Sequence, residues 1–305
     1  MPESERLPAV LTSSYPLDRL ENLIEDLQPI LGMNQPAVLD VDLRALEFVG
    51  PTCLALLIAA LKRVRDEGLN APGSRIRPPA SSDVHRYLER MDFMKLVTAQ
   101  PPEEDFERKP PVGFRPCQHF RSEEEQWATS RTLVEALAER CDCDEQARGA
   151  LSICLDEVCE NVLHHAYTSL GGFAAAQGWP ARGDFEIGIV DLGVGIRSSL
   201  SRNARYANVS DDATAIQTAL VPRVTSTPER NAGIGLAVTR LLLAANGGSF
   251  TVRSGFGAVR DVAGETRVEA MSAELPGTVI SLRASSERSL DIGAVYAKLE
   301  SIEAT

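Results

Sequence analysis

The hydrophobic pattern of the first hundred residues predicts a small unit of strands and helices. Residues 37–43 (AVLDVDL) alternate apolar and acidic side chains with period two, which predicts a strand. Residues 52–64 (TCLALLIAALKRV) are apolar on most faces and carry basic residues in the last turn before Gly68, which predicts a largely buried helix. A second helix over residues 82–93 follows a turn-rich segment. We therefore predict an α/β unit over residues 1–100.

Proline and charged residues dominate the segment QPPEEDFERKPP, residues 100–111, which holds little that could form a core. This composition predicts a linker over residues 101–112. A second unit, residues 113–305, follows it.

Helices come before most of the strands in the second unit, which predicts an α+β sandwich. The predicted helices cover residues 122–139, a segment that begins after the N-cap Asp144, and residues 235–245. The predicted strands cover residues 113–120, 185–193, 248–254 and 279–283. A long polar segment lies between the strand 185–193 and Asn231.

The predicted helix within residues 155–167 (LDEVCENVLHHAY) carries apolar side chains for a core together with an unusual number of polar ones. Unpaired polar groups cost roughly 1–3 kcal/mol each inside a protein, so this polarity needs a reason. Glu157, Asn161 and His165 are spaced four residues apart and therefore lie on one face of the helix. Side chains on one face of a helix can contact the same ligand.

Three glycine-containing turns accompany this helix. A strand runs into Asp191 and then into Gly193 and Gly195, where the backbone can pass close to a bound group. The segment NAGIGL, residues 231–236, opens a helix whose free N–H groups favour an anion. The segment PGT, residues 276–278, enters a late strand and places a hydroxyl there.

The segments EVCENVLHHA, DLGVGI, NAGIGL and PGT resemble, in this order, the N, G1, G2 and G3 boxes of the GHKL superfamily. This superfamily includes histidine-kinase ATP domains, anti-sigma-factor serine kinases, type II topoisomerases, mismatch-repair ATPases and heat-shock chaperones. The glutamate four residues before the asparagine and the ending His-Ala-Tyr are most similar to the anti-sigma-kinase branch. The resemblance covers residues 113–284 and implies a Bergerat-type α/β sandwich that binds ATP and Mg²⁺.

Each box implies roles for its residues. Asn161 would help to ligate Mg²⁺, and Glu157 would be the general base that activates a water or a protein hydroxyl. Asp191 would accept a hydrogen bond from the adenine amino group, with Thr278 close by. The other implied nucleotide-binding residues are Gly193, Gly195, Asn231, Gly233, Gly235 and Leu236.

The segment between the G1 and G2 boxes corresponds to the mobile ATP lid of the superfamily. Arg223 and Arg230 are candidates to bind the γ-phosphate, because a guanidinium can hold two oxygens at once; solvated loop arginines are the other interpretation. The box position of His165 indicates a structural hydrogen bond beside the site.

The first unit also resembles a known family. The segments VLDVDLRALEFVGPTCLALLIAALKRV and YLERMDFMKL are similar to a STAS domain, the fold of anti-sigma-factor antagonists. Thr52 falls where that family presents a phosphorylatable hydroxyl, but the usual aspartate and glycine are missing, so Thr52 is otherwise read as a helix cap. The resemblance implies a STAS-like interaction module.

Charge and composition restrict the partners. A formal net charge of -12 and a sequence pI near 4.9 argue against nucleic acid and anionic membranes as partners. No long apolar run and no secretory signal is present, so we expect a cytoplasmic protein.

The six cysteines lack paired zinc-type spacing. Cys141 and Cys143 form either a metal or redox pair or part of a surface loop, whereas Cys154 and Cys159 are expected in the core.

The sequence thus favours an ATP·Mg²⁺-binding regulator resembling anti-sigma-factor serine/threonine kinases. It would phosphorylate a partner, such as a STAS or sigma-factor-like regulator, or Thr52, or it would choose partners according to the bound nucleotide. The alternative is a dimeric GHKL clamp that hydrolyses ATP without phosphorylating protein; a homodimer is compatible with either. A binding module with little turnover is a third class. Clamps usually carry a transducer domain, whereas about twenty residues follow Arg283, so we expect a switch or kinase.

Overall fold

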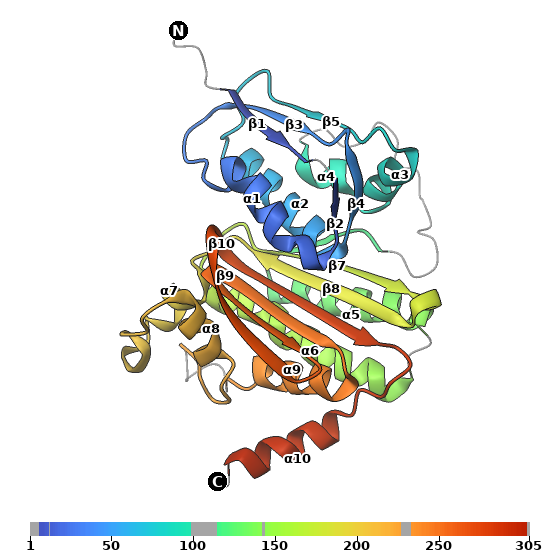
Figure 1. Ribbon diagram of the computed structural model, residues 1–305, viewed down its shortest axis with the longest axis vertical. Coiled ribbons are helices and arrows are strands. Elements are labelled where there is room, and N and C mark those ends of the chain that lie inside the picture. The colour runs from blue at the N-terminus through green and yellow to red at the C-terminus, as the bar shows by residue number, and fades with distance from the viewer. Residues whose placement is uncertain (1–5, 12, 99–114, 142–143, 227–232, 304–305) are drawn as a thin grey trace.

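The computed structural model describes residues 6–11, 13–98, 115–141, 144–226 and 233–303. Within these ranges the N-terminal unit lies above a central sheet, and the sheet with the helices below it forms the second unit (Figure 1). The predicted linker at residues 101–112 lies outside the described residues.

The N-terminal unit combines parallel strand pairs with four α-helices. Strands β1 (Arg6–Val10), β3 (Val38–Asp42) and β5 (Arg75–Arg77) form a parallel sheet in the order β1-β3-β5, and β2 (Ser13–Tyr15) pairs in parallel with β4 (Leu46–Val49). The helices are η1 (Leu17–Arg19, 3₁₀), α1 (Leu20–Leu31), α2 (Pro51–Asp66), α3 (Ser82–Arg90) and α4 (Phe93–Val97). The predicted strand at 37–43 and helix at 52–64 are confirmed as β3 and α2.

The helix predicted over residues 82–93 is divided in two. Asp92, at the start of α4, has a left-handed backbone with φ of 54°. An α-helix cannot continue through this conformation, so α3 ends at Arg90 and α4 begins at Phe93.

The second unit is built on a five-stranded antiparallel sheet in the order β6-β7-β8-β10-β9. Its strands are β6 (Gln118–Phe120), β7 (Gly172–Trp179), β8 (Asp184–Asp191), β9 (Ser249–Val262) and β10 (Glu265–Ser285). Its helices are α5 (Glu123–Cys141), α6 (Glu145–His165), η2 (Pro180–Arg182, 3₁₀), α7 (Gly195–Leu200), η3 (Ala204–Tyr206, 3₁₀), α8 (Asp212–Ala219), α9 (Gly235–Asn246) and α10 (Ile292–Glu303). The mixed α/β architecture agrees with the predicted sandwich.

Several boundaries follow from local chemistry. The Asp144 carboxylate accepts a hydrogen bond from the Ala147 N–H at 2.7 Å, so the predicted N-cap of α6 is confirmed. Strands β9 and β10 run well past the predicted bounds because they form a long hairpin that was not visible in the pattern. Strand β7 was missed.

Both faces of the central sheet are buried at β8, where successive side chains point alternately to the two faces. Phe185, Ile187 and Ile189 point to one face and belong to the core formed with α5, α6 and α9. Val190 points to the other face and belongs to the core of the N-terminal unit. All seven residues of FEIGIVD are buried, although Glu186 and Gly188 interrupt the apolar pattern on the second face.

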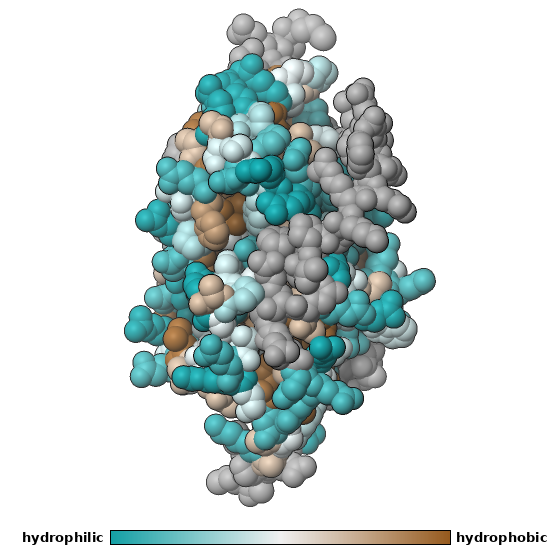
Figure 2. Space-filling model, turned by 90° about the vertical axis from the view of Figure 1, so that its right-hand side faces the viewer, coloured by the Kyte–Doolittle hydropathy of each residue, from teal (hydrophilic) through white to brown (hydrophobic). Residues whose placement is uncertain are grey.

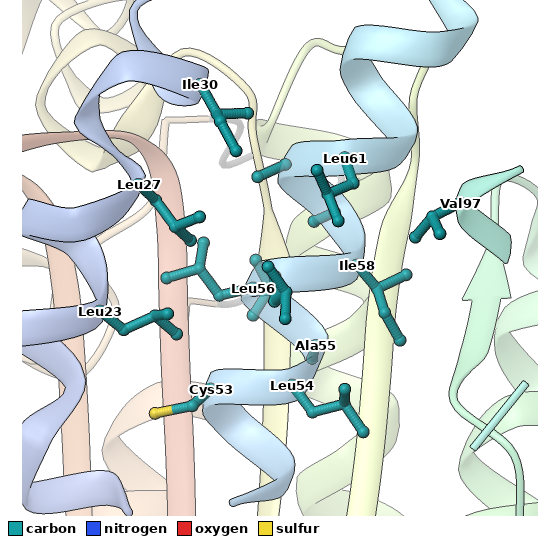
Figure 3. Packing of buried hydrophobic residues seen from close by; sticks show 14 of the residues in the cluster. Leu23, Leu27, Ile30, Cys53, Leu54, Ala55, Leu56, Ile58, Leu61 and Val97 are labelled. Carbon is teal, nitrogen blue, oxygen red and sulfur yellow. The ribbon is translucent and has the colours of Figure 1, made fainter. Parts of the chain in front are cut away.

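Helix α2 is the main element of the N-terminal unit that contacts this second face. Figure 3 shows α2 in front of the strands, with Leu23 and Leu27 of α1 on one side of it and Val97 on the other. Cys53, Leu54 and Leu56 of α2 are fully buried in this core. The two units therefore share one continuous hydrophobic core across the domain boundary.

The N-terminus of α2 contacts the carboxylate of Glu186 on β8. The Thr52 N–H and hydroxyl donate to Glu186 Oε1 at 3.2 and 2.8 Å, and Arg283 donates to Glu186 Oε2 at 2.8 Å. Gly50, the N-cap residue, supplies no side-chain cap of its own. Glu186 thus caps α2 from the other unit, and the positive end of the helix dipole stabilises its negative charge.

Figure 2 shows one side of the molecule as mostly hydrophilic, with hydrophobic residues in separate spots. Among the described residues, every helix is too short or too polar to cross a bilayer. The four cysteines whose side chains are described, Cys53, Cys117, Cys154 and Cys159, are free and buried, which confirms the core placement of the last two. The side chains of Cys141 and Cys143 lie outside the described residues.

Gly188 sets how closely α2 approaches the sheet. A Cβ at this position would lie 2.3 Å from the Thr52 Cα, so Gly188→Ala must push α2 outward. We expect a loss of about 1–3 kcal/mol in the free energy of unfolding, measured by urea denaturation.

Gly149→Ala is the matched control, because a Cβ there meets nothing within 4 Å on the exposed side of α6. It should raise the stability by up to about 1 kcal/mol through helix propensity. Equal effects of the two substitutions would contradict the close packing.

Candidate functional site

One pocket collects residues from all four predicted boxes. It opens between α6, the end of β8, the middle of β10, helix α7 and the start of α9. The predicted residues that line it are Glu157, Asn161, His165, Asp191, Gly195, Gly233, Gly235, Leu236 and Thr278. Gly193 lies in the adjoining turn and lines a neighbouring cleft. Arg230 and Asn231 lie outside the described residues.

Helix α6 places its polar side chains on two different faces. Glu157, Asn161 and His165 all line the pocket, as their spacing predicted. Asp156 points elsewhere: it accepts hydrogen bonds from Ser130 and Gln126 of α5 at 2.5 and 3.1 Å. The pocket therefore uses one polar face of α6, and Asp156 on another face holds α5 in place.

Glu157 is half-buried, and burial raises its pKa, with Glu160 and Asp156 adding repulsion. The start of α9 packs directly against it, since a Cβ on Gly235 would lie 2.1 Å from Glu157 Oε2. Only glycine lets the N-terminus of α9 come this close. The free N–H groups of that terminus thus lie beside the carboxylate at one end of the pocket.

Asp191 forms the closed end of the pocket. It is 5% exposed, and burial raises the pKa of its carboxyl to about 6 although the Gly193 N–H and Thr278 both donate hydrogen bonds to it. The Gly193 N–H lies 2.8 Å from Asp191 Oδ1. Thr278 is the partner of Asp191 in the β8–β10 ladder, so the fold brings these two residues together.

The turn after Asp191 is tied to the end of α6. The Val194 N–H donates to the Ala166 carbonyl at 2.9 Å, and a Cβ on Gly193 would lie 2.0 Å from the same oxygen. This contact fixes the distance between the helix that carries Asn161 and the turn beside Asp191. The spacing between the end of α6 and the turn after Asp191 is therefore set by Ala166, through a contact that does not involve β9.

Residues 219–226, between α7 and α9, contribute to the pocket lining and contain order that the sequence did not indicate. His165 Nδ1 lies 3.0 Å from Ser226 Oγ, so the predicted structural hydrogen bond of His165 is present. Burial lowers the pKa of His165 to about 4, and His164 adds repulsion, so the ring is neutral at pH 7. Arg223 is exposed, and its N–H donates to the Gly233 carbonyl at 2.8 Å.

These features can be compared with known families. Residues 120–245 match the histidine kinase-like ATPase domain. The matched residues include α6, the Asp191 turn and the start of α9, and the match suggests ATP binding. Strand β10 with Thr278 lies beyond the match and joins the site through the sheet. No curated protein matches the chain.

The chemistry of the pocket fits an adenine nucleotide. A buried carboxylate at one end can accept hydrogen bonds from an amino group, and apolar side chains form the walls beside it. These side chains are Val162, Ile189, Ile196, Leu200 and Ile280. At the other end, the Asn161 oxygen suits Mg²⁺, which prefers oxygen ligands and keeps several waters.

Sequence reasoning missed Ser226 and the apolar wall residues Ile196 and Leu200. Ser226 lies in a stretch of polar residues without periodicity, so nothing marked it. The apolar spacing of residues 196 and 200, one helical turn apart, did contain a signal for the short helix α7.

The raised pKa of Asp191 gives a pH dependence of stability. The folded state keeps the proton up to about pH 6, whereas the unfolded carboxyl releases it near pH 4. Relative to Asp191→Asn, the wild type should therefore gain about 2 kcal/mol between pH 7.5 and 4.5, with the change concentrated between pH 4 and 6. Urea denaturation of both proteins at the two pH values measures it, and parallel pH profiles would show that Asp191 has an ordinary pKa.

Proposed function

We propose that this protein binds ATP with Mg²⁺ and transfers the γ-phosphate to a serine or threonine of a protein partner, as anti-sigma-factor kinases do. The observation that carries the proposal is the arrangement of Glu157 and Asn161, one turn apart on α6, facing the same pocket as the buried Asp191. Such a reaction uses one carboxylate as the base and a separate carboxylate to bind the adenine.

In this proposal each pocket residue has one task. Asp191 accepts a hydrogen bond from the adenine amino group and so orients the nucleotide. Bound Mg²⁺ supplies charge neutralisation for the phosphates, and Asn161 holds it. Glu157 accepts the proton of the attacking hydroxyl, and its raised pKa supports this role because a base works best when its pKa approaches the ambient pH.

The acceptor hydroxyl belongs to another molecule in this proposal. Thr52 is 0% exposed and lies against the sheet face opposite the pocket, where it donates to Glu186. The N-terminal unit, which we propose to be STAS-like, is then a fixed part of the kinase. A STAS or sigma-factor-like regulator in the cytoplasm is the partner that we propose.

Incubation with γ-labelled ATP and cell extract tests the function. We expect label on a partner protein and none on Thr52, and Glu157→Gln should lower the rate of transfer by about 10²–10⁴-fold while ADP still binds. Glu160→Gln, the adjacent carboxylate outside the pocket lining, is the control and should retain activity. Release of free phosphate alone would favour an ATP-hydrolysing clamp.

Asn161→Ala tests the metal site. We expect the wild type to bind ATP more tightly with Mg²⁺ than without it, and the variant to lose this increment because the carboxamide ligand is missing. Calorimetry with ATP in the presence of Mg²⁺ or of EDTA measures the difference, and circular dichroism checks the fold. A variant with the full Mg²⁺ increment would show that the ion is held elsewhere.

A further inference from the structure

Strand β9 carries two adjacent residues that connect the N-terminal unit with the nucleotide pocket. Arg253 and Ser254 are 0% and 2% exposed and, because side chains alternate along a strand, they point to opposite faces of the sheet. Arg253 points to the N-terminal unit, and Ser254 points to the turns of the pocket. Neither belongs to the boxes or to the residues matched by the ATPase family.

The hairpin is irregular just before the turn that contains Gly277. The register between β9 and β10 shifts between Ala270 and Leu275 and again between Leu275 and Thr278. Such bulges interrupt the ladder and leave backbone carbonyls without strand partners. Buried carbonyls need other donors, since an unpaired one is costly.

The Arg253 guanidinium supplies several of these donors. It donates to the carbonyls of Gly255 and Gly257 on β9, the latter at 3.3 Å, and to the carbonyl of Ala273 on β10. Its charge is balanced from the N-terminal unit, because Arg253 Nε lies 3.1 Å from Glu21 Oε2 on α1. A carboxylate of the N-terminal unit thus holds the residue that organises the bulge.

Ser254 continues this organisation into the pocket. Its hydroxyl donates to the Gly277 carbonyl at 2.7 Å and accepts a hydrogen bond from the Ile196 N–H at 3.0 Å. Ile196 lines the pocket immediately after Gly195, and Gly277 precedes Thr278. One hydroxyl therefore joins the two turns on either side of Asp191.

We propose that Ser254 is a positioning residue for the nucleotide, and that the Glu21–Arg253 ion pair of the docked N-terminal unit holds Ser254 and the Gly277 turn in place. This inference rests on the proposed function. It assigns to the N-terminal unit a role in nucleotide affinity, exerted through the adenine end of the pocket. The Asn161 end lies on α6 and is independent of this contact.

Calorimetry with ADP tests the role of Ser254. Ser254→Ala should raise the Kd for ADP about tenfold, since two buried backbone groups lose their partner. The Kd should rise by the same factor with and without Mg²⁺, because the substitution leaves the Asn161 end of the pocket unchanged. Ser281→Ala is the matched control: its hydroxyl is equally buried on a strand but faces Thr52, so the Kd should stay within about twofold.

The ion pair is tested in the same assay. Glu21→Gln should raise the Kd about threefold. Glu25→Gln, four residues along α1 and exposed, should leave it unchanged, because glutamine can still accept the hydrogen bond that Ser272 of β10 donates to Glu25 at 3.3 Å. Combining Glu21→Gln with Ser254→Ala should weaken binding by less than the product of the two effects, because both act on one turn. Glu21 is partly exposed, so this variant gives a result even where Ser254→Ala fails to fold.

The outcomes separate the two proposals. A wild-type protein that ignores ADP overturns the proposed function itself. A wild type that binds ADP, with Ser254→Ala and Ser281→Ala equal in affinity, overturns only the positioning role. Equal Kd values for Glu21→Gln and Glu25→Gln overturn the contribution of the N-terminal unit.

Discussion

The burial of one antiparallel sheet on both faces is the constraint on which the rest of the structure depends. Helices α5, α6 and α9 cover one face and leave the pocket at its edge, while the N-terminal unit covers the other. The apolar residues of β8 and the paired part of β10 thus belong to one core or the other according to their position along the strand. The residues that complete the pocket, Asp191 and Thr278, are positioned by strands whose other faces are buried under α2.

This arrangement explains why two charged residues buried in the sheet, Glu186 and Arg253, each have a partner of opposite charge. Glu186 is 1% exposed, yet it meets Arg283 and the start of α2, so its charge is compensated. Arg253 is compensated by Glu21 in the same way. Breaking such a pair leaves a buried charge, which is strongly destabilising, so these contacts fix the docking geometry more than they add to its stability.

Local patterns predicted the elements and the residues that share a helix face. The four-residue spacing on α6 correctly brought Glu157, Asn161 and His165 to one pocket, because helix geometry alone determines that face. Strand β7, GFAAAQGW, was missed since small residues without alternation give no strand signal. The contact between Thr52 and Glu186 joins residues 134 positions apart, and no local pattern contains such a pairing.

The contact between Thr52 and Glu186 also bears on phosphorylation of Thr52, which lies at a helix start that resembles a phosphorylation site. The Thr52 hydroxyl lies 2.8 Å from a carboxylate oxygen, so a phosphate on it would place like charges together in a buried setting. To reach a kinase, Thr52 would first have to leave the sheet, which would expose the apolar face of α2 and the Val190 side of β8 to water. A carboxylate that caps α2 therefore stabilises the unmodified, docked form. The Thr52 hydroxyl joins the two halves of the chain. In a STAS domain, which the N-terminal unit resembles in sequence, the corresponding hydroxyl would be offered to a partner.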